Sequence, residues 1–417
     1  MKLDLYLNSK MVATTVERSR GRQVVLEYTD QVDRDHPPET ALLSCSLPTP
    51  GPSRPAATRA FLEGLLLEGE ALRTIAATSV GARLDLEEIA PATTADAVHL
   101  LAEYGRECAG AVAVVPHGTP YAAGFEGSYR TVSDQQIANL LDRLPTRPLG
   151  ADLLADIRMS LAGAQAKLLL ARIDGRWAEP VGGLPSTHIL KPTGRWPLSA
   201  DNETIVMELA RHAGLTDMSV WVEDFGDQRV FVTERFDRIV DGSSPVKRLH
   251  QEDMCQALGL RPRDKYQIGR PSQNMARLLR RWAADPARSV RELFSQLVFR
   301  AVVGDEDGHG KNYGLLLEGG KVAVAPLYDC LSTQIYPSLA GRMGTQLGRQ
   351  VNLAAVDLTA LVEEGVACGI GESEATQLVD TLADRILAAM QAISPPSVDV
   401  RALECVLGTI GLRVRRL

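Results

Sequence analysis

Apolar and polar positions alternate near the start of the chain, and residues 1–35 are expected to form strands. Leu3, Leu5 and Leu7 occupy every second position, and residues 24–28 are rich in strand formers. Residues 36–55 carry six prolines, which argue against a regular element there. Apolar residues at helical spacing then predict helices near 57–77, 94–106 and 133–143. The first third of the chain therefore mixes strands with helices.

The pattern changes from residue 157 onward. A turn of small residues leads into a strand, and Asp174-Gly175 is a hairpin signal. Residues 187–191 and 230–236 are expected to form further strands, with a helix over 202–213 between them. The remainder of the chain is predicted to be mostly helical, with one exception, residues 304–332.

The exception follows an apolar helix and contains a predicted hairpin. A polar loop holding Asp307 and Asn312 leads into a strand at 313–317, and a Gly-Gly turn leads back through a second strand at 321–325. Because a hairpin returns the chain to its start, Asp329 is expected to lie beside Asn312. Two carboxylates and an amide thus converge at one end of the hairpin.

These three side chains are suited to phosphoryl transfer. Mg²⁺ prefers oxygen ligands, which Asn312 and Asp329 provide, and Asp307 is placed to accept the proton of an attacking hydroxyl. Kinases have the same five-residue step from the catalytic Asp to a metal-binding Asn, followed by a metal-binding Asp after a hairpin-sized gap. The letters differ, since HRD is absent and YDC replaces DFG. Any one of these residues alone would be read as a turn or a cap.

The nucleotide side of the site is predicted earlier in the chain. Residues 160–167 form a loop of small residues that allows backbone N–H groups to approach phosphates. Lys191 ends a predicted strand, where kinases place a phosphate-pairing lysine. Glu203 either pairs with Lys191 or favours the dipole of the helix that it begins.

Composition narrows the range of partners. The chain has 417 residues, 45% of them hydrophobic, and a net charge of −7, which is unfavourable for direct binding along a nucleic-acid backbone. Six scattered cysteines without metal-ligand spacing indicate reduced thiols. The N-terminus lacks the apolar block of a signal peptide, and no run of 18 apolar residues occurs. We therefore expect a cytoplasmic protein with no membrane partner.

Several motifs in one order resemble the HipA kinases, the toxins of bacterial toxin–antitoxin pairs. The motifs are SLAGAQAK (160–167), THILKP (187–192), DNETIVMELARHAGL (201–215), VTERFDR (232–238), RLHQEDMCQALG (248–259), GDEDGHGKN (304–312) and APLYDCLS (325–332). FLEGLLLEGEA (61–71) and GRECAGAVAV (105–114) resemble the family's N-terminal subdomain. The resemblance thus covers nearly the whole chain.

The resemblance implies an α+β, bilobal protein-kinase-like fold of the HipA type. An extra N-terminal α/β subdomain would span 1–115. A kinase N-lobe with the phosphate loop and the adenine-contacting strand would span 116–238. A mostly helical C-lobe with the catalytic loop and metal site would span 239–417.

The resemblance also implies ATP and Mg²⁺ as cofactors and a role for each site residue. Asp307 would be the catalytic Asp, and Asn312 and Asp329 the Mg²⁺ ligands. In the family, the serine that matches Ser160 is autophosphorylated, which ejects the phosphate loop and switches the enzyme off. The ATP-binding residues would be Ala162, Gly163, Ala164, Gln165, Ala166, Lys167, Lys191, Glu234, Arg235, Phe236, His309, Gly310, Lys311, Asn312, Tyr328 and Asp329.

Family targets include aminoacyl-tRNA synthetases, whose phosphorylation stops tRNA charging and leads to growth arrest and persistence. The expected partner is a HipB-like helix-turn-helix antitoxin, and operator DNA would be reached only through it. Two positions depart from the family: Ala166 replaces a usual Glu, and Glu306 stands where Thr is common. Two alternatives remain open: a catalytically weak, antitoxin-binding co-repressor, and a small-molecule kinase on the same fold.

Overall fold

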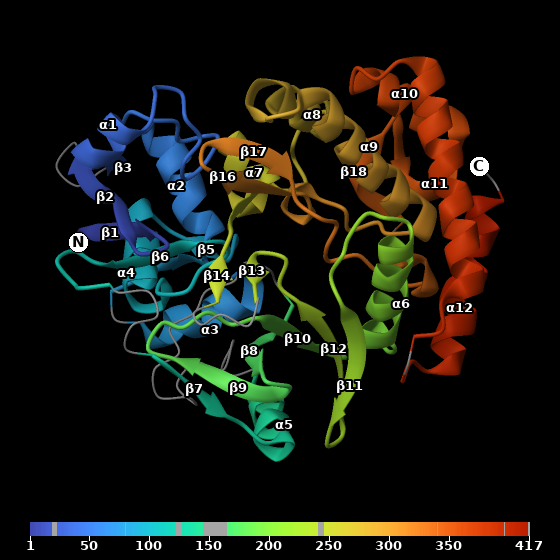
Figure 1. Ribbon diagram of the computed structural model, residues 1–417, viewed down its shortest axis with the longest axis horizontal. Helices are drawn as coiled ribbons and strands as arrows, with labels where there is room; N and C mark the ends of the chain where they lie inside the picture. The colour runs from blue at the N-terminus through green and yellow to red at the C-terminus, as the bar shows by residue number, and fades with distance from the viewer. Residues whose placement is uncertain are drawn as a thin grey trace.

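A computed structural model describes most of the chain (Figure 1). The N-terminal segment lies on one side of the molecule, a six-stranded sheet lies below the centre, and the C-terminal helices lie on the opposite side. The ranges described are 1–18, 23–79, 81–121, 127–144, 165–240, 246–339, 341–395 and 397–415.

The first part of the chain, from β1 to β6, is called the N-terminal unit below. Its antiparallel sheet has the strand order β3-β2-β1-β6, and α2 and α4 pack on it. Leu3 and Leu5 are fully buried, as their alternation predicts. The elements are β1 (Leu3–Leu7), β2 (Lys10–Arg18), β3 (Gln23–Tyr28), α1 (Asp30–Asp35), α2 (Pro55–Gly64), α3 (Gly69–Thr78), β4 (Leu84–Asp85), β5 (Ala90–Pro91), α4 (Thr94–Tyr104) and β6 (Val112–Pro116).

Two expectations for this unit are wrong in detail. The stretch 57–77 forms two helices, α2 and α3, instead of one. The chain turns after Gly64, which lies against Gln256 so closely that a Cβ would stand 2.5 Å from the Gln256 Cγ. Tertiary packing therefore ends α2 where periodicity alone continues it. A short helix, α1, also lies within the region expected to be strands only.

A second sheet with six strands follows, in the order β11-β12-β10-β8-β9-β7. The predicted hairpin joins β8 to β9, with Asp174 and Gly175 both at positive φ, as a tight two-residue turn requires. The predicted strands and the helix α6 are also present. The elements are β7 (Ser128–Thr131), α5 (Asp134–Arg143), β8 (Leu168–Ile173), β9 (Arg176–Val181), β10 (His188–Pro192), α6 (Ser199–His212), β11 (Val220–Phe225) and β12 (Gln228–Glu234).

The rest of the chain is mainly helical but has more strands than the apolar pattern predicts. Besides the expected hairpin β16–β17, β15 joins its edge, with Asp253 opposite Gly314. These strands are too short for a period of two to be recognised. The elements are β13 (Arg238–Ile239), β14 (Lys247–Arg248), β15 (His250–Asp253), α7 (Met254–Leu258), η2 (Pro262–Asp264), α8 (Pro271–Trp282), α9 (Pro286–Val303), η3 (Gly310–Asn312), β16 (Gly314–Glu318), β17 (Lys321–Val324), η4 (Thr333–Ile335), β18 (Arg342–Leu347), β19 (Gln350–Asn352), η5 (Leu353–Ala355), α10 (Leu358–Ala367), α11 (Glu372–Ala392) and α12 (Val400–Val414).

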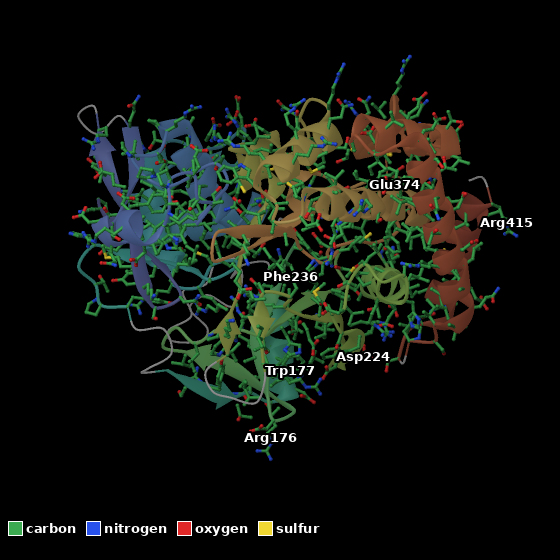
Figure 2. The ribbon with its side chains drawn as sticks, turned by 45° about the horizontal axis from the view of Figure 1, so that its top comes forward. Arg176, Trp177, Asp224, Phe236, Glu374 and Arg415 are labelled. Carbon is green, nitrogen blue, oxygen red and sulfur yellow. The ribbon has the colours of Figure 1, made fainter. Side chains whose placement is uncertain are left out.

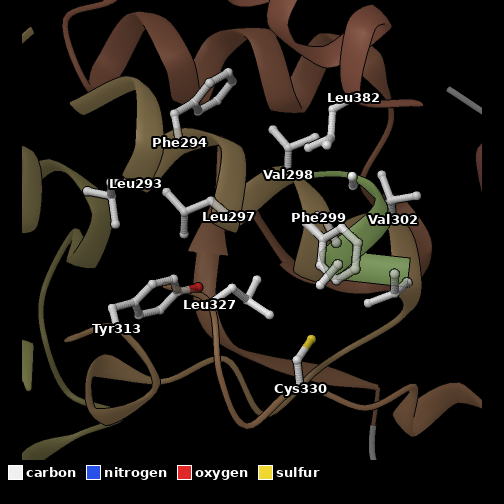
Figure 3. Close-up of a cluster of buried hydrophobic side chains, with 14 of the residues drawn as sticks. Leu293, Phe294, Leu297, Val298, Phe299, Val302, Tyr313, Leu327, Cys330 and Leu382 are labelled. Carbon is white, nitrogen blue, oxygen red and sulfur yellow. The ribbon is translucent and has the colours of Figure 1, made fainter. Parts of the chain in front are cut away.

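Helix α9 runs through the largest apolar core and leads directly into the polar loop. Asp285 caps its start by accepting from the Arg288 N–H, and Gly304 ends it in the left-handed conformation at φ 82°. Figure 3 shows its side chains packed between Leu327 and Leu382. This rigid support fixes the point at which the polar loop begins. Within the described ranges, no helix is long and apolar enough to span a membrane.

Candidate active site

The hairpin β16–β17 brings Asn312 and Asp329 together, as the sequence predicts. The Asn312 side-chain amide donates to Asp329 Oδ2 over 3.1 Å and to the Asp329 carbonyl over 3.3 Å. Asp329 has a φ of 52°, in the left-handed region that residues other than Gly rarely adopt. Such a backbone persists only where its surroundings hold it in place.

Arg300 provides that support from the last turn of α9. Its buried guanidinium donates to the carbonyls of Asp329 (3.0 Å), Tyr328 (2.7 Å) and Asn312 (3.1 Å) and forms an ion pair with Asp305. Arg300 thus binds the chain both where it enters the hairpin β16–β17 and where it leaves it. Sequence reasoning missed Arg300, although an arginine within the apolar run VFRAVV is itself a signal of a buried role.

Lys191 joins the predicted nucleotide side of the site to Asp329. It projects from β10, and its Nζ lies 2.6 Å from Glu203 Oε1 and 2.5 Å from Asp329 Oδ1. Burial disfavours its charge, but the two carboxylates outweigh burial and raise the pKa of Lys191 above its ordinary value. The pairing with Glu203, one of two readings of that residue, is therefore present.

The two carboxylates that hold Lys191 differ in their environments. Glu203 is buried at the start of α6, and burial raises its pKa to about 7 although Lys191 acts against this. The cleft walls also disfavour a charge on Asp329, but Lys191 outweighs them and holds the pKa of Asp329 well below its usual range. Asp329 is therefore ionised at neutral pH.

The donor set fits a magnesium ion. The Asn312 Oδ1 is buried and has no hydrogen-bond partner, and the nearby Asp329 side chain remains 45% exposed to the cleft. An orphaned oxygen next to an ionised carboxylate matches the preference of Mg²⁺ for one or two protein oxygens completed by phosphate and water. No cluster of three or more His, Cys, Asp or Glu suited to a metal occurs among the described residues, and this kind of site does not require one.

Asp307 lies nearby with an exposed side chain. Its backbone N–H donates to Asp305 Oδ1 over 2.9 Å, and its own Oδ1 accepts from the Tyr266 hydroxyl over 2.6 Å. Both Asp307 and Asp329 line the same cavity. The structure thus brings the three predicted residues to one place.

That cavity has a volume of about 250 Å³ and is lined by residues of the N-terminal unit, of the six-stranded sheet and of the mainly helical part of the chain. Gly64, Glu68 and Ala109 come from the N-terminal unit. Its lining includes several carboxylates, the lysines Lys167, Lys191, Lys265 and Lys311, and the apolar side chains Met207, Met218 and Phe231. Apolar side chains together with lysines suit a ligand with a flat ring and a polyanionic tail.

The lysines are balanced by carboxylates. Lys311 Nζ lies 2.5 Å from Asp253 Oδ2 and 3.6 Å from Glu68 Oε1, and Lys265 Nζ lies 3.0 Å from Glu68 Oε2. Burial, followed by the charge of Lys191, lowers the pKa of Lys167 to about 8. An anion that entered the cavity would therefore favour the charged form of Lys167.

Some of the remaining predicted ATP-binding residues line the cavity and others do not. Gln165 and Glu234 line the cavity, whereas Ala166 and Gly310 do not. Phe236 also lines it and stacks on Tyr328, with ring centroids 5.3 Å apart; Figure 2 shows Phe236 between the six-stranded sheet and the helical lobe. His309 lines the cavity too, and burial, followed by Lys265, lowers its pKa to about 4. Ser160, Ala162, Gly163 and Ala164 lie outside the described residues.

Arg235 also borders the cavity, but its guanidinium forms ion pairs in a buried group that we call the Glu107 cluster: Glu107, Ser186, Arg235, Asp237 and Arg238. Glu107 Oε1 lies 3.3 Å from nitrogens of both arginines and accepts from the Ser186 N–H over 2.9 Å. Asp237 accepts from Arg235 over 2.8 Å and from the Gly110 N–H over 2.7 Å. The cluster joins the N-terminal unit to the strand end that carries Phe236. Sequence reasoning did not find Glu107.

Comparisons with known proteins agree with this architecture. A model described as the HipA-like C-terminal domain matches residues 159–390, and one described as the HipA N-terminal domain matches residues 3–115. The relative named putative kinase Y4mE, from Sinorhizobium fredii, is 38% identical over 371 residues, which cover 86% of each chain. The serine/threonine-protein kinase toxin HipA of Shewanella oneidensis is 30% identical over 251 residues, 57% of each chain.

A solved structure matches along nearly the whole length. A chain in the complex of Shewanella oneidensis HipA, HipB and operator DNA superposes with a TM-score of 0.80 at 22% identity, covering 99% of this chain and 96% of that chain. The likeness confirms the expected α+β, HipA-type bilobal fold with its extra N-terminal unit. Together with the two family matches, it shows that this chain belongs to the HipA family.

Proposed function

We propose that this protein is an ATP- and Mg²⁺-dependent Ser/Thr protein kinase and the toxin of a toxin–antitoxin module. One observation carries the proposal: Lys191, Asn312, Asp329 and Asp307 line one cavity, whose lining also includes further lysines and apolar side chains. Phosphoryl transfer depends mainly on positioning and charge stabilisation, and this arrangement provides both. The names of two relatives, a putative kinase and a Ser/Thr kinase toxin, support the same reading.

In this proposal each side chain has one task. Asp307 accepts the proton of the substrate hydroxyl, and Lys191, held by Glu203, contacts the phosphates. Asn312 and Asp329 would hold Mg²⁺, which neutralises charge on the phosphates when it is bound. Phe236, Tyr328, Glu234 and Arg235 border the adenine, and His309, Gly310 and Lys311 complete the nucleotide site. The loop of Ala162, Gly163, Ala164, Gln165, Ala166 and Lys167 covers the phosphates.

The proposal extends to regulation and partners. Ser160 would be autophosphorylated, which would switch the enzyme off. A HipB-like helix-turn-helix antitoxin would bind the chain and carry it to operator DNA, which agrees with the net charge of −7. A cytoplasmic protein such as an aminoacyl-tRNA synthetase would be the target, and its phosphorylation would cause growth arrest. We retain the division into 1–115, 116–238 and 239–417 as part of this proposal.

The proposal is tested by incubating the purified full chain with γ-labelled ATP and Mg²⁺. We expect label on Ser160, located by mass spectrometry, and none in Asp307→Asn or Ser160→Ala. Asp329→Ala should abolish Mg²⁺-dependent transfer because it removes a charged oxygen ligand and the partner of Lys191. Label that persists in Asp307→Asn would contradict the role of Asp307.

The alternatives give different outcomes in the same assay. A catalytically weak co-repressor would bind its antitoxin but transfer no phosphate to itself or to added protein. A small-molecule kinase would label a low-mass fraction of a cell extract and no protein. Co-purification with the protein encoded beside it tests for the antitoxin.

A further inference from the structure

Tyr266 lies in the loop that follows η2 and reaches the side chain of Asp307. Its hydroxyl donates to Asp307 Oδ1 over 2.6 Å, although the tyrosine side chain as a whole is 54% exposed. Exposed tyrosines ordinarily hydrogen-bond to water, so a short bond to a carboxylate requires that the ring be held. Tyr266 does not border the cavity, whereas its neighbour Lys265 does.

The ring of Tyr266 is held from two directions. It meets the His309 imidazole edge-on, with centroids 5.0 Å apart and planes at 75°, and the Lys265 ammonium lies 5.5 Å from its centroid. The backbone of the catalytic loop also contacts this segment. The Gly310 N–H donates to the Lys265 carbonyl over 3.4 Å, and a Cβ on Gly310 would stand 2.5 Å from Ile268 Cδ1, so a larger residue would have to displace that side chain.

Glu68 fixes the other side of the loop. It immediately precedes α3 of the N-terminal unit, and its Oε2 lies 3.0 Å from Lys265 Nζ. Both side chains of this ion pair are largely buried, with exposed fractions of 12% and 17%, so the contact is weakly screened. Contacts therefore run without a gap from the N-terminal unit through Lys265 and Tyr266 to Asp307.

We propose that Tyr266 is a positioning residue for Asp307 and that Glu68 holds it in place, an inference that rests on the proposed kinase function. A carboxylate on a short side chain rotates easily about its last bond. The Tyr266 hydroxyl binds one oxygen of Asp307 and leaves the other oxygen for the hydroxyl of the substrate. The N-terminal unit thereby becomes part of the catalytic apparatus.

The direct test is Tyr266→Phe in the full chain, which removes one hydroxyl and keeps the ring. A hydrogen bond to a charged group is expected to change the rate of phosphate transfer between about 10-fold and 100-fold. With Ser160 of the chain itself as the acceptor, kcat here denotes the rate constant of its labelling at saturating ATP, and KM the ATP concentration that gives half that rate. We expect kcat to fall within that range while KM for ATP stays unchanged, because Tyr266 does not border the nucleotide cavity. Tyr104→Phe, the same change in α4 of the N-terminal unit, is the matched control and should keep the wild-type kcat.

A double-mutant cycle tests the contribution of Glu68. Glu68→Gln alone should lower kcat by about 3-fold to 10-fold, because Lys265 loses a charged partner. If Glu68 acts through Tyr266, adding Glu68→Gln to Tyr266→Phe should lower kcat little further. Fully multiplicative losses would remove Glu68 from the proposal.

The results separate this inference from the proposed function. A wild-type chain that transfers no phosphate overturns both. An active wild type whose Tyr266→Phe variant keeps its kcat overturns the positioning role alone. A Tyr266→Phe variant whose loss is confined to KM for ATP also overturns it, because the tyrosine would then act on nucleotide binding.

Discussion

Two buried regions of this molecule differ in the kind of side chain that fills them. The core around α9 consists of apolar side chains such as Leu293, Leu297 and Phe299, all fully or almost fully buried. The Glu107 cluster is equally buried but consists of charged groups and one hydroxyl. The first region forms the body of the helical lobe (Figure 3), and the second joins two parts of the chain next to the cavity.

Apolar and charged side chains differ in how strictly they select their partners. Apolar contacts are not directional, so a core of this kind accepts many residues of similar volume. Buried charges must be matched one by one, because an unmatched charge has neither water nor a partner. We therefore expect the Glu107 cluster to orient the N-terminal unit more strictly than apolar side chains of the same size would.

Glu107→Gln should give the largest change in stability. The substitution keeps the shape but leaves the buried Arg235 and Arg238 with less compensation for their charges, which costs about 3–5 kcal/mol. Denaturant unfolding at pH 7 would measure it. Glu39→Gln is the matched control, because Glu39 pairs with Arg281 at the surface with an exposed fraction of 66%, and should cost under about 1 kcal/mol. Equal losses in the two variants would contradict the comparison.

Leu297→Ala in α9 should give the next largest change, about 3 kcal/mol, from lost burial and a residual cavity. The free energy of unfolding from denaturant melts measures this effect. Leu297→Met, which conserves volume, should cost less than about 1.5 kcal/mol. If Leu297→Met lowers the free energy of unfolding as much as Leu297→Ala does, the apolar core is as selective as the Glu107 cluster, and the contrast between the two regions is wrong.

The third and smallest expected effect is a dependence of the Glu107→Gln stability loss on pH. Burial disfavours the charge of Glu107, yet Arg235 and Arg238 outweigh it and hold the pKa of Glu107 below its ordinary value of 4.5. A carboxylate with a lowered folded-state pKa stabilises the protein above its unfolded pKa and loses that contribution as the pH falls. The loss caused by Glu107→Gln should therefore shrink by about 1 kcal/mol between pH 7 and pH 4.

The Leu297→Ala loss serves as the reference for this measurement. No titrating group is removed by that substitution, so its cost should be the same at both pH values. Unfolding of wild type and both variants in parallel gives the two differences directly. A Glu107→Gln loss that stays constant down to pH 4 would show that the charge of Glu107 does not stabilise the fold.

The sequence predicted the hairpin side of the site because local rules govern it. A strand, a Gly-Gly turn and a second strand bring Asn312 and Asp329 together, and no distant residue is needed for that conclusion. The sequence also predicted Lys191 and offered Glu203 as its partner, because Lys191 lies near the end of a strand and Glu203 lies early in the next helix along the chain. Spacing along the chain is informative wherever neighbouring elements make the contact.

The rest of the site depends on partners from distant parts of the chain. Glu68 and Glu107 are ordinary glutamates in helical or turn-like sequence, and only folding brings them to Lys265 and Arg235. Tyr266 likewise carries no local sign of its bond to Asp307. Short strands such as β15 were missed for a related reason: pairing with β16, and not their own pattern, makes them strands.

The position of Glu68 has a consequence for how the protein is made. Glu68 and Asp329 line one cavity, yet the ribosome adds them far apart in time, on the order of half a minute at about 10 residues per second. Between the synthesis of Glu68 and that of Asp329, the nascent chain holds only some of the residues that line the cavity. The cavity therefore stays incomplete until synthesis has passed the end of the hairpin β16–β17.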